Sequence, residues 1–261
     1  MNSVSNLGLT CQGLCKTYQT KNGLISAIKD VSFCVKEHEF ICIVGPSGCG
    51  KTTLLKLIAG LLHPTSGQIF FSQDPQDGIP RSALVFQEHG LFPWMTVLDN
   101  VAFGLEMRVK DKKERRDLSR PLIEKMGLLA FTNNYPHELS MGMRQRVGIA
   151  RAFVSKAQIL LMDEPLGSLD AQTKLILQEE LLKIWKEDQK CVVYITHDIE
   201  EAIFLGDRLL VMTARPGHIR EEIVIPFDRP RDLSIKELTE FAKMKGHIWR
   251  ILEEEVRKSC G

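Results

Sequence analysis

The chain has 261 residues, of which 44% are hydrophobic and 26% are charged, as in an ordinary globular protein with a sizeable core. Its 34 basic and 33 acidic residues leave a formal net charge of +1, which argues against a nucleic-acid-binding protein that relies on a broad basic face. No run of ~18 apolar residues would span a membrane, and the first ten residues lack the pattern of a signal peptide. We therefore expect a soluble protein that reaches a membrane only by docking onto one that spans it.

Seven cysteines are scattered along the chain. Their odd number and the lack of a signal peptide favour a reducing cytosol. Cys11 and Cys15 have the spacing of half a metal site, but no second pair of cysteine or histidine residues accompanies them. We interpret both as structural thiols.

The first third of the chain is predicted to consist of short strands. Residues 41–44 form a continuous apolar run, which is typical of a buried parallel strand. A glycine-rich loop follows directly, and residues 52–60 have the pattern of a helix. Because a phosphate-binding loop has this order of strand, loop and helix, the sequence predicts a nucleotide site here. The same context disfavours the alternative, a chance glycine turn.

The glycine-rich loop carries groups suited to a nucleotide triphosphate. Its glycines let backbone N–H groups turn toward the phosphates, and the following helix adds the positive end of its dipole. Lys51 can reach the β- and γ-phosphates, the Thr52 hydroxyl can coordinate Mg²⁺, and Thr53 can contact the α-phosphate. The predicted nucleotide-binding residues of the loop are Gly45, Pro46, Ser47, Gly48, Cys49, Gly50, Lys51, Thr52 and Thr53.

The middle of the chain is predicted to contain a strand that ends in a polar residue, followed by helices. Gln87 follows a predicted strand at 83–86, and its side-chain amide can ligate Mg²⁺ or the attacking water and report occupancy to a partner. The alternative is an ordinary surface glutamine. Farther on, the spacing of Thr96 and Asp99 predicts a capping box at the start of one helix. A second helix carries the apolar residues Leu118, Leu122, Ile123 and Met126.

A third helix is predicted to begin near Ser140. The Ser140 hydroxyl and the N–H of Gly142 can bind a γ-phosphate at this helix N-terminus. The alternative is an ordinary N-cap, which would be the better interpretation without the other motifs.

Two further buried strands end in polar residues. Residues 158–162 lead into Asp163 and Glu164, at the edge where an open α/β sheet binds its ligands. Asp163 is suited to hold Mg²⁺ through water and Glu164 to polarise the attacking water, although the two could instead be a helix-capping pair. Residues 191–195 lead to His197, which can contact the γ-phosphate. On its own, a histidine at a strand end is more often structural.

The end of the chain is predicted to contain a hairpin and a helix. Residues 209–212 and 219–225 form the hairpin, turned at Pro216 and Gly217. The last thirty residues have the pattern of an amphipathic helix, which Gly246 could kink. Its predicted apolar side comprises Leu238, Phe241, Ile248, Ile251 and Leu252.

In this order, the motifs resemble those of the ATP-binding cassette (ABC) ATPases, and the resemblance covers essentially the whole chain. Tyr18 lies where the family stacks an aromatic ring on adenine, although on its own it would more often be a core residue. The corresponding segments are 45–52 (Walker A), Gln87 (Q-loop), 139–146 (signature), 159–164 (Walker B), 167–170 (D-loop) and His197 (switch histidine).

The resemblance implies an α/β fold: a P-loop NTPase (RecA-like) core with an antiparallel β-subdomain and an inserted α-helical subdomain. A single ABC ATPase domain would cover residues 1–261. Residues 1–87 and 157–225 would form the nucleotide-binding core, 88–156 the helical subdomain with the signature, and 226–261 a C-terminal helical extension. The implied cofactors are ATP and Mg²⁺, with Glu164, His197, Lys51 and Gln87 as catalytic residues and Thr52, Gln87 and Asp163 as metal ligands.

Within the family, the chain is similar to the ATPases of nitrate, sulfonate, taurine and bicarbonate importers. The residues behind this similarity are 91–97, 143–152, 214–217 and 230–232. It implies a peripheral subunit on the cytoplasmic face of the inner membrane that energises uptake of a small anion. The implied partners are a second ATPase subunit, most simply in a homodimer, an integral membrane permease and, indirectly, an extracytoplasmic substrate-binding protein.

Three residues depart from the family pattern. Met141 replaces the first of two signature glycines, but Ser140 and Gly142 are kept, so we expect function with some loss. Met143 cannot donate a hydrogen bond to ribose. His38 stands where a turn glycine is typical and is expected to be strained at a positive φ.

Three other functions are weighed against this interpretation. A non-transport ABC ATPase of repair, translation or chromosome handling would usually have a long coiled-coil insert or a second cassette, and this chain has neither. A P-loop kinase or GTPase would not need the Ser140 motif or His197. A weakly active partner or regulatory cassette in a heterodimer is kept open by Met141.

Overall fold

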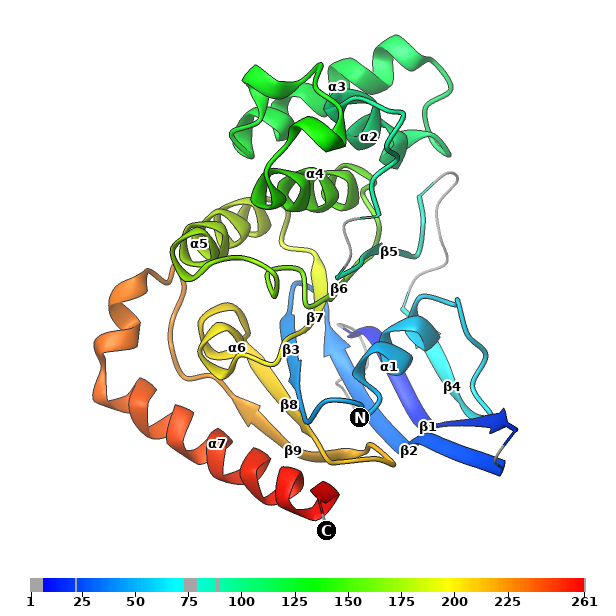
Figure 1. Ribbon diagram of the computed structural model, residues 1–261, viewed down its shortest axis with the longest axis vertical. Helices are drawn as coiled ribbons and strands as arrows, with labels where there is room; N and C mark the ends of the chain where they lie inside the picture. Colours follow the sequence, from blue (N-terminus) through cyan, green and yellow to red (C-terminus); the bar gives the residue numbers. More distant parts are fainter. Residues whose placement is uncertain (1–6, 22, 73–78, 88–89, 261) are drawn as a thin grey trace. The chain divides into compact units, whose positions relative to one another are not determined.

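The computed structural model of the chain describes residues 7–21, 23–72, 79–87 and 90–260, and only the backbone of residues 259 and 260 (Figure 1). The chain divides into two compact units: unit 1 comprises Met1–Gln73 and Gln189–Gly261, and unit 2 comprises Asp74–Asp188. Unit 2 contains two strands besides its helices, so it is larger than the predicted helical subdomain. The predicted subdomain borders stay a prediction.

Unit 1 contains a three-stranded antiparallel sheet. Its strand β1 (Leu7–Thr20) pairs with β2 (Gly23–Lys36) on one side and with β4 (Ser66–Phe71) on the other. The prediction of short strands is wrong here, because β1 and β2 have 14 residues each. Register shifts, one of them beside Gly13 with φ 57°, interrupt the alternation of apolar and polar residues and so hide the length of the strands in the sequence.

A second sheet of unit 1 carries the strand β3 (Phe40–Val44), in which every residue is buried. It pairs in parallel with β7 (Cys191–Ile195) and β8 (Arg208–Met212), and β9 (Ile219–Val224) runs antiparallel to β8. Parallel strands covered on both faces read as continuous apolar runs, which is why their positions are visible in the sequence. The predicted buried strands and the predicted hairpin are confirmed.

Helix α7 (Thr239–Cys260) lies beside α6 (Ile199–Leu205) and β8 in unit 1 (Figure 1). It runs through Gly246 as one helix. Leu238, predicted on its apolar side, precedes the helix and is 45% exposed. The helix buries Phe241, Ile248 and Ile251. A short 3₁₀ helix at Leu233–Glu237 leads into it.

In unit 2, β5 (Ser82–Val85) pairs in parallel with β6 (Ile159–Asp163). The longer helices of this unit are α2 (Val97–Ala102), α3 (Lys112–Lys125), α4 (Met141–Val154) and α5 (Ala171–Asp188), with 3₁₀ turns at Phe103–Leu105, Leu129–Phe131 and Pro136–Glu138. Within the described ranges, none of the chain's helices is long and apolar enough to cross a membrane.

Side-chain caps fix where the helices of unit 2 begin. The Thr96 hydroxyl accepts a hydrogen bond from the N–H of Asp99 at 3.2 Å, at the start of α2. Asp111 accepts from the N–H of Glu114 at 2.7 Å, at the start of α3. Each cap satisfies an N–H that has no partner inside its helix. The predicted start at Thr96 is confirmed, whereas Leu118 on α3 is 46% exposed rather than packed.

Candidate nucleotide-binding site

The phosphate loop, residues 45–50, joins β3 to the helix α1 (Lys51–Ile58) and has a backbone that requires glycine. Gly48 has φ 74° and Gly50 has φ 109°, both in the left-handed region. A Cβ atom on Gly50 would also lie 2.5 Å from Cγ2 of Ile28 and 2.9 Å from the carbonyl oxygen of Ala27. The loop therefore rests directly on β2, and strand, loop and helix follow one another in the predicted order.

The N-terminus of α1 can receive an anion. Gly50 precedes the helix without a side-chain hydrogen bond, and the first turn contains no acidic residue, so the positive end of the dipole is not neutralised locally. Lys51 is 7% exposed, and its ammonium donates hydrogen bonds to the carbonyl oxygens of Gly45 at 2.8 Å and Pro46 at 3.0 Å. These contacts hold a positive charge at the phosphate loop.

Cys49 is a fully buried thiol within the phosphate loop. Burial raises its pKa, although the nearby charge of Lys51 acts in the opposite direction. The thiol is therefore neutral near pH 7 and adds no negative charge where phosphates would bind.

Tyr18, on β1, lies next to the first turn of α1. Its hydroxyl is 3.4 Å from Oγ1 of Thr53, and the ammonium of Lys16 is 5.4 Å from the centre of its ring. Thr52, on the same turn of α1, is exposed. An aromatic ring with a cation over it thus lies next to the first turn of α1, and the stacking of Tyr18 on adenine stays a prediction.

His197 follows β7, and its neighbours are held by a buried network. Glu201, 1% exposed on α6, accepts hydrogen bonds from the Tyr194 hydroxyl at 2.9 Å and from the Thr196 hydroxyl. The N–H of Asp198 donates to Oγ1 of Thr196 at 3.0 Å. Burial, and next the charge of Glu201, raises the pKa of Tyr194, so its hydroxyl remains a donor. The exposed His197 is therefore carried on an anchored backbone.

In unit 2, Asp163 and Glu164 stand at the end of β6. Asp163 is its last residue and is 7% exposed. Glu164 has φ 45°, a left-handed conformation that costs a non-glycine residue about 1–3 kcal/mol and that clusters at active sites. The N–H of Gly167 donates to the carbonyl oxygen of Glu164 at 3.1 Å and closes the turn. The backbone therefore changes direction at the residue predicted to be catalytic.

Gln87 belongs to the same edge of unit 2 as Asp163. It is exposed two residues after β5, and β5 pairs in parallel with β6 so that Val85 lies opposite Met162. Because parallel strands end at the same edge of a sheet, the amide of Gln87 and the carboxylate of Asp163 belong to the same edge.

Ser140 and Gly142 lie at the N-terminus of α4. Ser140 is exposed, and its hydroxyl accepts a hydrogen bond from the N–H of Met143 at 3.3 Å, so it is an N-cap. A Cβ atom on Gly142 would lie 3.2 Å from Cγ2 of Thr173, a tight approach between α4 and α5. A cap does not exclude a phosphate contact, because the N-terminal dipole attracts anions in either case.

Residues 28–167 match the family model described as ABC transporter. The chain belongs to the ABC transporter family. It is an ABC ATPase, and the predicted family is confirmed. It is 45% identical to an uncharacterised ABC transporter ATP-binding protein of Methanocaldococcus jannaschii, over 96% of this chain and 93% of the relative.

Two further relatives of this ABC ATPase have names that state a substrate. A nitrate import ATP-binding protein of Synechocystis sp. is 44% identical, over 91% of this chain and 92% of the relative. A taurine import ATP-binding protein of Pelagibacter ubique is 45% identical, over 84% of this chain and 83% of the relative.

Solved structures of ABC cassettes share the fold of this ATPase. The dimeric structure of a bacterial ABC transporter cassette matches with a TM-score of 0.73 and 33% identity, over 84% of this chain and all of that chain. A dimeric post-hydrolysis state of an ATP-binding cassette bound to ADP and phosphate matches with a TM-score of 0.74 and 33% identity, over the same shares. The predicted α/β fold is confirmed, with one mostly parallel sheet, in which β9 runs antiparallel to β8, and one antiparallel sheet.

Two departures from the ABC pattern have structural consequences. His38 has φ 61°, which confirms the predicted strain, and its Nδ1 is 2.5 Å from the carbonyl oxygen of Gln189, itself at φ 39°. Met141, in the first turn of α4, is 43% exposed. The substitution at Met141 therefore places an apolar side chain on the surface beside Ser140.

Two features of this ABC ATPase have no prediction in the sequence. Glu200 and Glu201 are adjacent carboxylates in the first turn of α6, and nothing in the residue type shows that Glu201 is the buried one. The left-handed backbone of Glu164 leaves no signal in the residue type.

Proposed function

We propose that this ATPase is the ATP-binding and ATP-hydrolysing subunit of an importer, and that it energises uptake of a small anion such as nitrate, taurine or another sulfonate, or bicarbonate. The observation that carries the proposal is its 44–45% identity to nitrate and taurine import ATP-binding proteins along most of the chain. The pore would be a separate integral permease, supplied by an extracytoplasmic binding protein. This ATPase would lie on the cytoplasmic face of the inner membrane.

The phosphate loop and Lys51 would bind the β- and γ-phosphates, with Thr53 at the α-phosphate and Tyr18 at adenine. Glu164 would orient and polarise the attacking water, and His197 would contact the γ-phosphate. Most of the rate enhancement would come from this positioning and from the positive charge around the phosphates.

The residues predicted to hold Mg²⁺ have the right chemistry for it. Thr52 offers a hydroxyl, Gln87 an amide oxygen and Asp163 a carboxylate, all hard oxygen ligands of the kind that Mg²⁺ prefers. Bound there with ATP, Mg²⁺ would neutralise charge on the phosphate oxygens. Asp163, being 7% exposed, would hold the ion or its water shell in a fixed position.

Two copies of the chain would enclose ATP between them, head to tail. ATP on the Lys51 loop of one copy would meet Ser140 and Gly142 of the other, so that the nucleotide joins the two. This explains why phosphate-binding features occur at two helix N-termini of one chain, α1 and α4. Light scattering on Glu164→Gln tests it: ATP should convert a monomer into a dimer, and adding Lys51→Ala should abolish the shift. A Glu164→Gln protein that binds ATP and stays monomeric contradicts the arrangement.

A growth experiment tests the transport function. We expect a strain lacking this gene to lose growth on nitrate as the sole nitrogen source or on taurine as the sole sulfur source. The wild-type gene should restore growth, whereas Lys51→Ala should not. Unchanged growth and unchanged uptake of nitrate, taurine and bicarbonate in the deleted strain would contradict anion import.

The presence of Met141 in the signature favours a second candidate function, that of a weakly active partner cassette in a heterodimer. We expect Met141→Gly to hydrolyse ATP at an equal or up to about fivefold higher rate, because glycine removes an exposed side chain beside Ser140 and costs α4 only about 1 kcal/mol. Phosphate release measures this, with Met107→Gly at another exposed methionine as the control. A clear loss of turnover would show a specific role of Met141. A gain far above fivefold would favour the second candidate.

A further inference from the structure

We propose that Glu255, on the C-terminal helix α7, is a positioning residue for ATP hydrolysis. It fixes the turn at residues 213–218 between β8 and β9, and this turn supports the phosphate loop from behind. The inference rests on the proposed binding of ATP at the phosphate loop. The chain of contacts runs from Glu255 through Ala214 and Gly217 to Cys49, all within unit 1.

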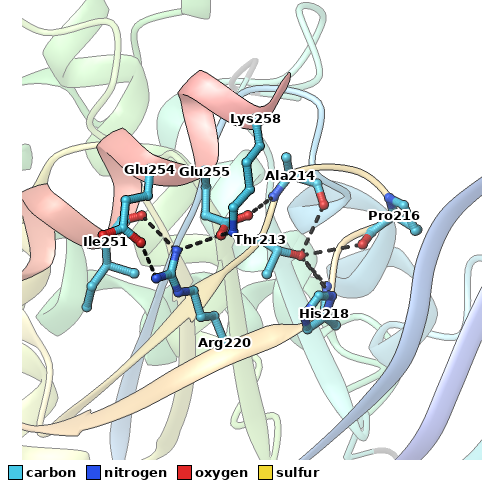
Figure 2. Close-up of polar contacts among 9 residues, drawn as sticks. All are labelled: Thr213, Ala214, Pro216, His218, Arg220, Ile251, Glu254, Glu255 and Lys258. Carbon is cyan, nitrogen blue, oxygen red and sulfur yellow. Dashed lines mark hydrogen bonds and ion pairs between the residues drawn. The ribbon is translucent and has the colours of Figure 1, made fainter. Parts of the chain in front are cut away.

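Glu255 is a buried carboxylate, 3% exposed, surrounded by donors (Figure 2). Its Oε2 accepts a hydrogen bond from the N–H of Ala214 at 3.1 Å. Its Oε1 accepts from Nη1 of Arg220 at 2.6 Å and from Nζ of Lys258 at 2.7 Å. Burial acts to raise the pKa of Glu255, but the hydrogen bonds from Lys258, Ala214 and Arg220 outweigh it and hold the pKa below its usual value. The side chain is therefore ionised near pH 7 and attracts all three donors.

The turn that Glu255 holds is stiffened from within. Oγ1 of Thr213 accepts a hydrogen bond from the N–H of His218 at 3.1 Å and lies 3.0 Å from its Nδ1 (Figure 2). The N–H of Thr213 donates to the carbonyl oxygen of His218 at 3.0 Å. On the far side, Gly217 bonds to β2, donating to Ala27 at 3.0 Å and accepting from the N–H of Lys29 at 2.9 Å. Because of these bonds, a displacement of Ala214 at the start of the turn would also displace Gly217 at its tip.

The tip of this turn touches the phosphate loop. A Cβ atom on Gly217 would lie 2.0 Å from the carbonyl oxygen of Cys49, so only glycine permits this approach. The carbonyl of Ala27 accepts from Gly217, and it is also the atom that would lie 2.9 Å from a Cβ on Gly50. Gly217 and Ala27 thus form a wall against which Cys49 and Gly50 rest. A shift of the wall would move the N–H groups offered to the phosphates.

Glu254 is a matched control for Glu255. It also pairs with Arg220, through Nη2, but its side chain is 60% exposed. Of the two glutamates, Glu255 is the one that accepts a hydrogen bond from the turn, at Ala214. In Glu255→Gln, an amide with two donors of its own would face three donors, so the contacts to Ala214, Arg220 and Lys258 cannot all be kept. Glu254→Gln loses a surface ion pair and leaves the turn in place.

The test uses the full-length ATPase and measures the KM and kcat of ATP hydrolysis, the Kd of ADP and the Tm. We expect Glu255→Gln to raise the KM for ATP and the Kd of ADP about tenfold, the effect of losing a charge-assisted hydrogen bond, with a smaller change in kcat. Glu254→Gln should stay within about twofold of wild type in all three constants. A role of Glu255 confined to stability would lower the Tm and the active fraction but leave KM and Kd unchanged, and that result overturns the proposal.

Two further variants keep the proposal testable if Glu255→Gln does not fold. Lys258→Met removes one of the three donors of Glu255. The Lys258 side chain is 64% exposed, so the change is tolerable on the surface, and it should raise the KM for ATP about twofold to threefold. An unchanged KM contradicts the proposal. Lys51→Ala distinguishes a wrong ATP site from a wrong role of Glu255. If Lys51→Ala leaves ADP binding intact, the nucleotide does not bind at the phosphate loop. If it abolishes binding while Glu255→Gln matches Glu254→Gln, only the positioning role of Glu255 is wrong.

Discussion

Glu164→Gln is expected to slow ATP turnover by at least about a hundredfold, because a neutral amide cannot polarise the attacking water as a carboxylate does. ATP affinity should change little, since the substitution leaves the phosphate loop untouched. The measurement is phosphate release in single-turnover and steady-state reactions. Glu187→Gln, at a carboxylate of unit 2 whose side chain is 58% exposed, is the control and should turn over at the wild-type rate.

The left-handed backbone at Glu164 gives this experiment a second comparison. With φ 45°, the position would favour glycine, so Glu164→Gly should keep or improve folding while losing turnover. A Glu164→Gln protein with wild-type turnover would remove Glu164 from the catalytic residues. The strain at this position would then need another explanation.

Lys51→Ala is expected to weaken ATP binding by about a hundredfold and to abolish turnover, because two or more charge-assisted hydrogen bonds to phosphates are lost. The ammonium lies within 2.8 Å of the Gly45 carbonyl oxygen, so the loop itself also loses a bond. Titration calorimetry with ATP measures the loss. Lys56→Ala, on the last turn of the same helix, is the matched control and should bind ATP normally. Equal affinities of the two variants would mean that the phosphates bind elsewhere.

Local features of this chain could be predicted from its sequence to the residue. The N-caps at Thr96 and Ser140 and the buried strands around residues 41–44 and 191–195 depend on neighbours in the chain and on burial of both strand faces. The strain at His38 was accessible through the family resemblance, because a turn glycine is typical at this position. The lengths of β1 and β2 were not, since the bulges break the pattern that marks a strand.

Contacts between distant residues could not be predicted in this way. Glu255 and Ala214 are 41 positions apart. A periodic pattern of apolar residues predicts a helix or a strand, but it does not predict which turn a helix contacts. An amphipathic pattern places Glu255 among the charged residues of α7, where a carboxylate would ordinarily be solvated. Glu255 is only 3% exposed and contacts Ala214, and both facts follow only from the packing of α7 against β8. The same holds for the candidate site. Its binding and catalytic residues can be recognised in the motifs, whereas the residues that hold them in place are visible only in the packing.

The buried thiol of the phosphate loop has a practical consequence for labelling. Cys49 is fully buried and its pKa is raised, so it is slow to form the thiolate that reacts with maleimides or oxidants. Cys15 and Cys34 are only half-buried. Fluorophores or spin labels should therefore attach to these two thiols, on β1 and β2, before they reach the loop. The antiparallel sheet can carry a spectroscopic reporter while the loop keeps its native chemistry.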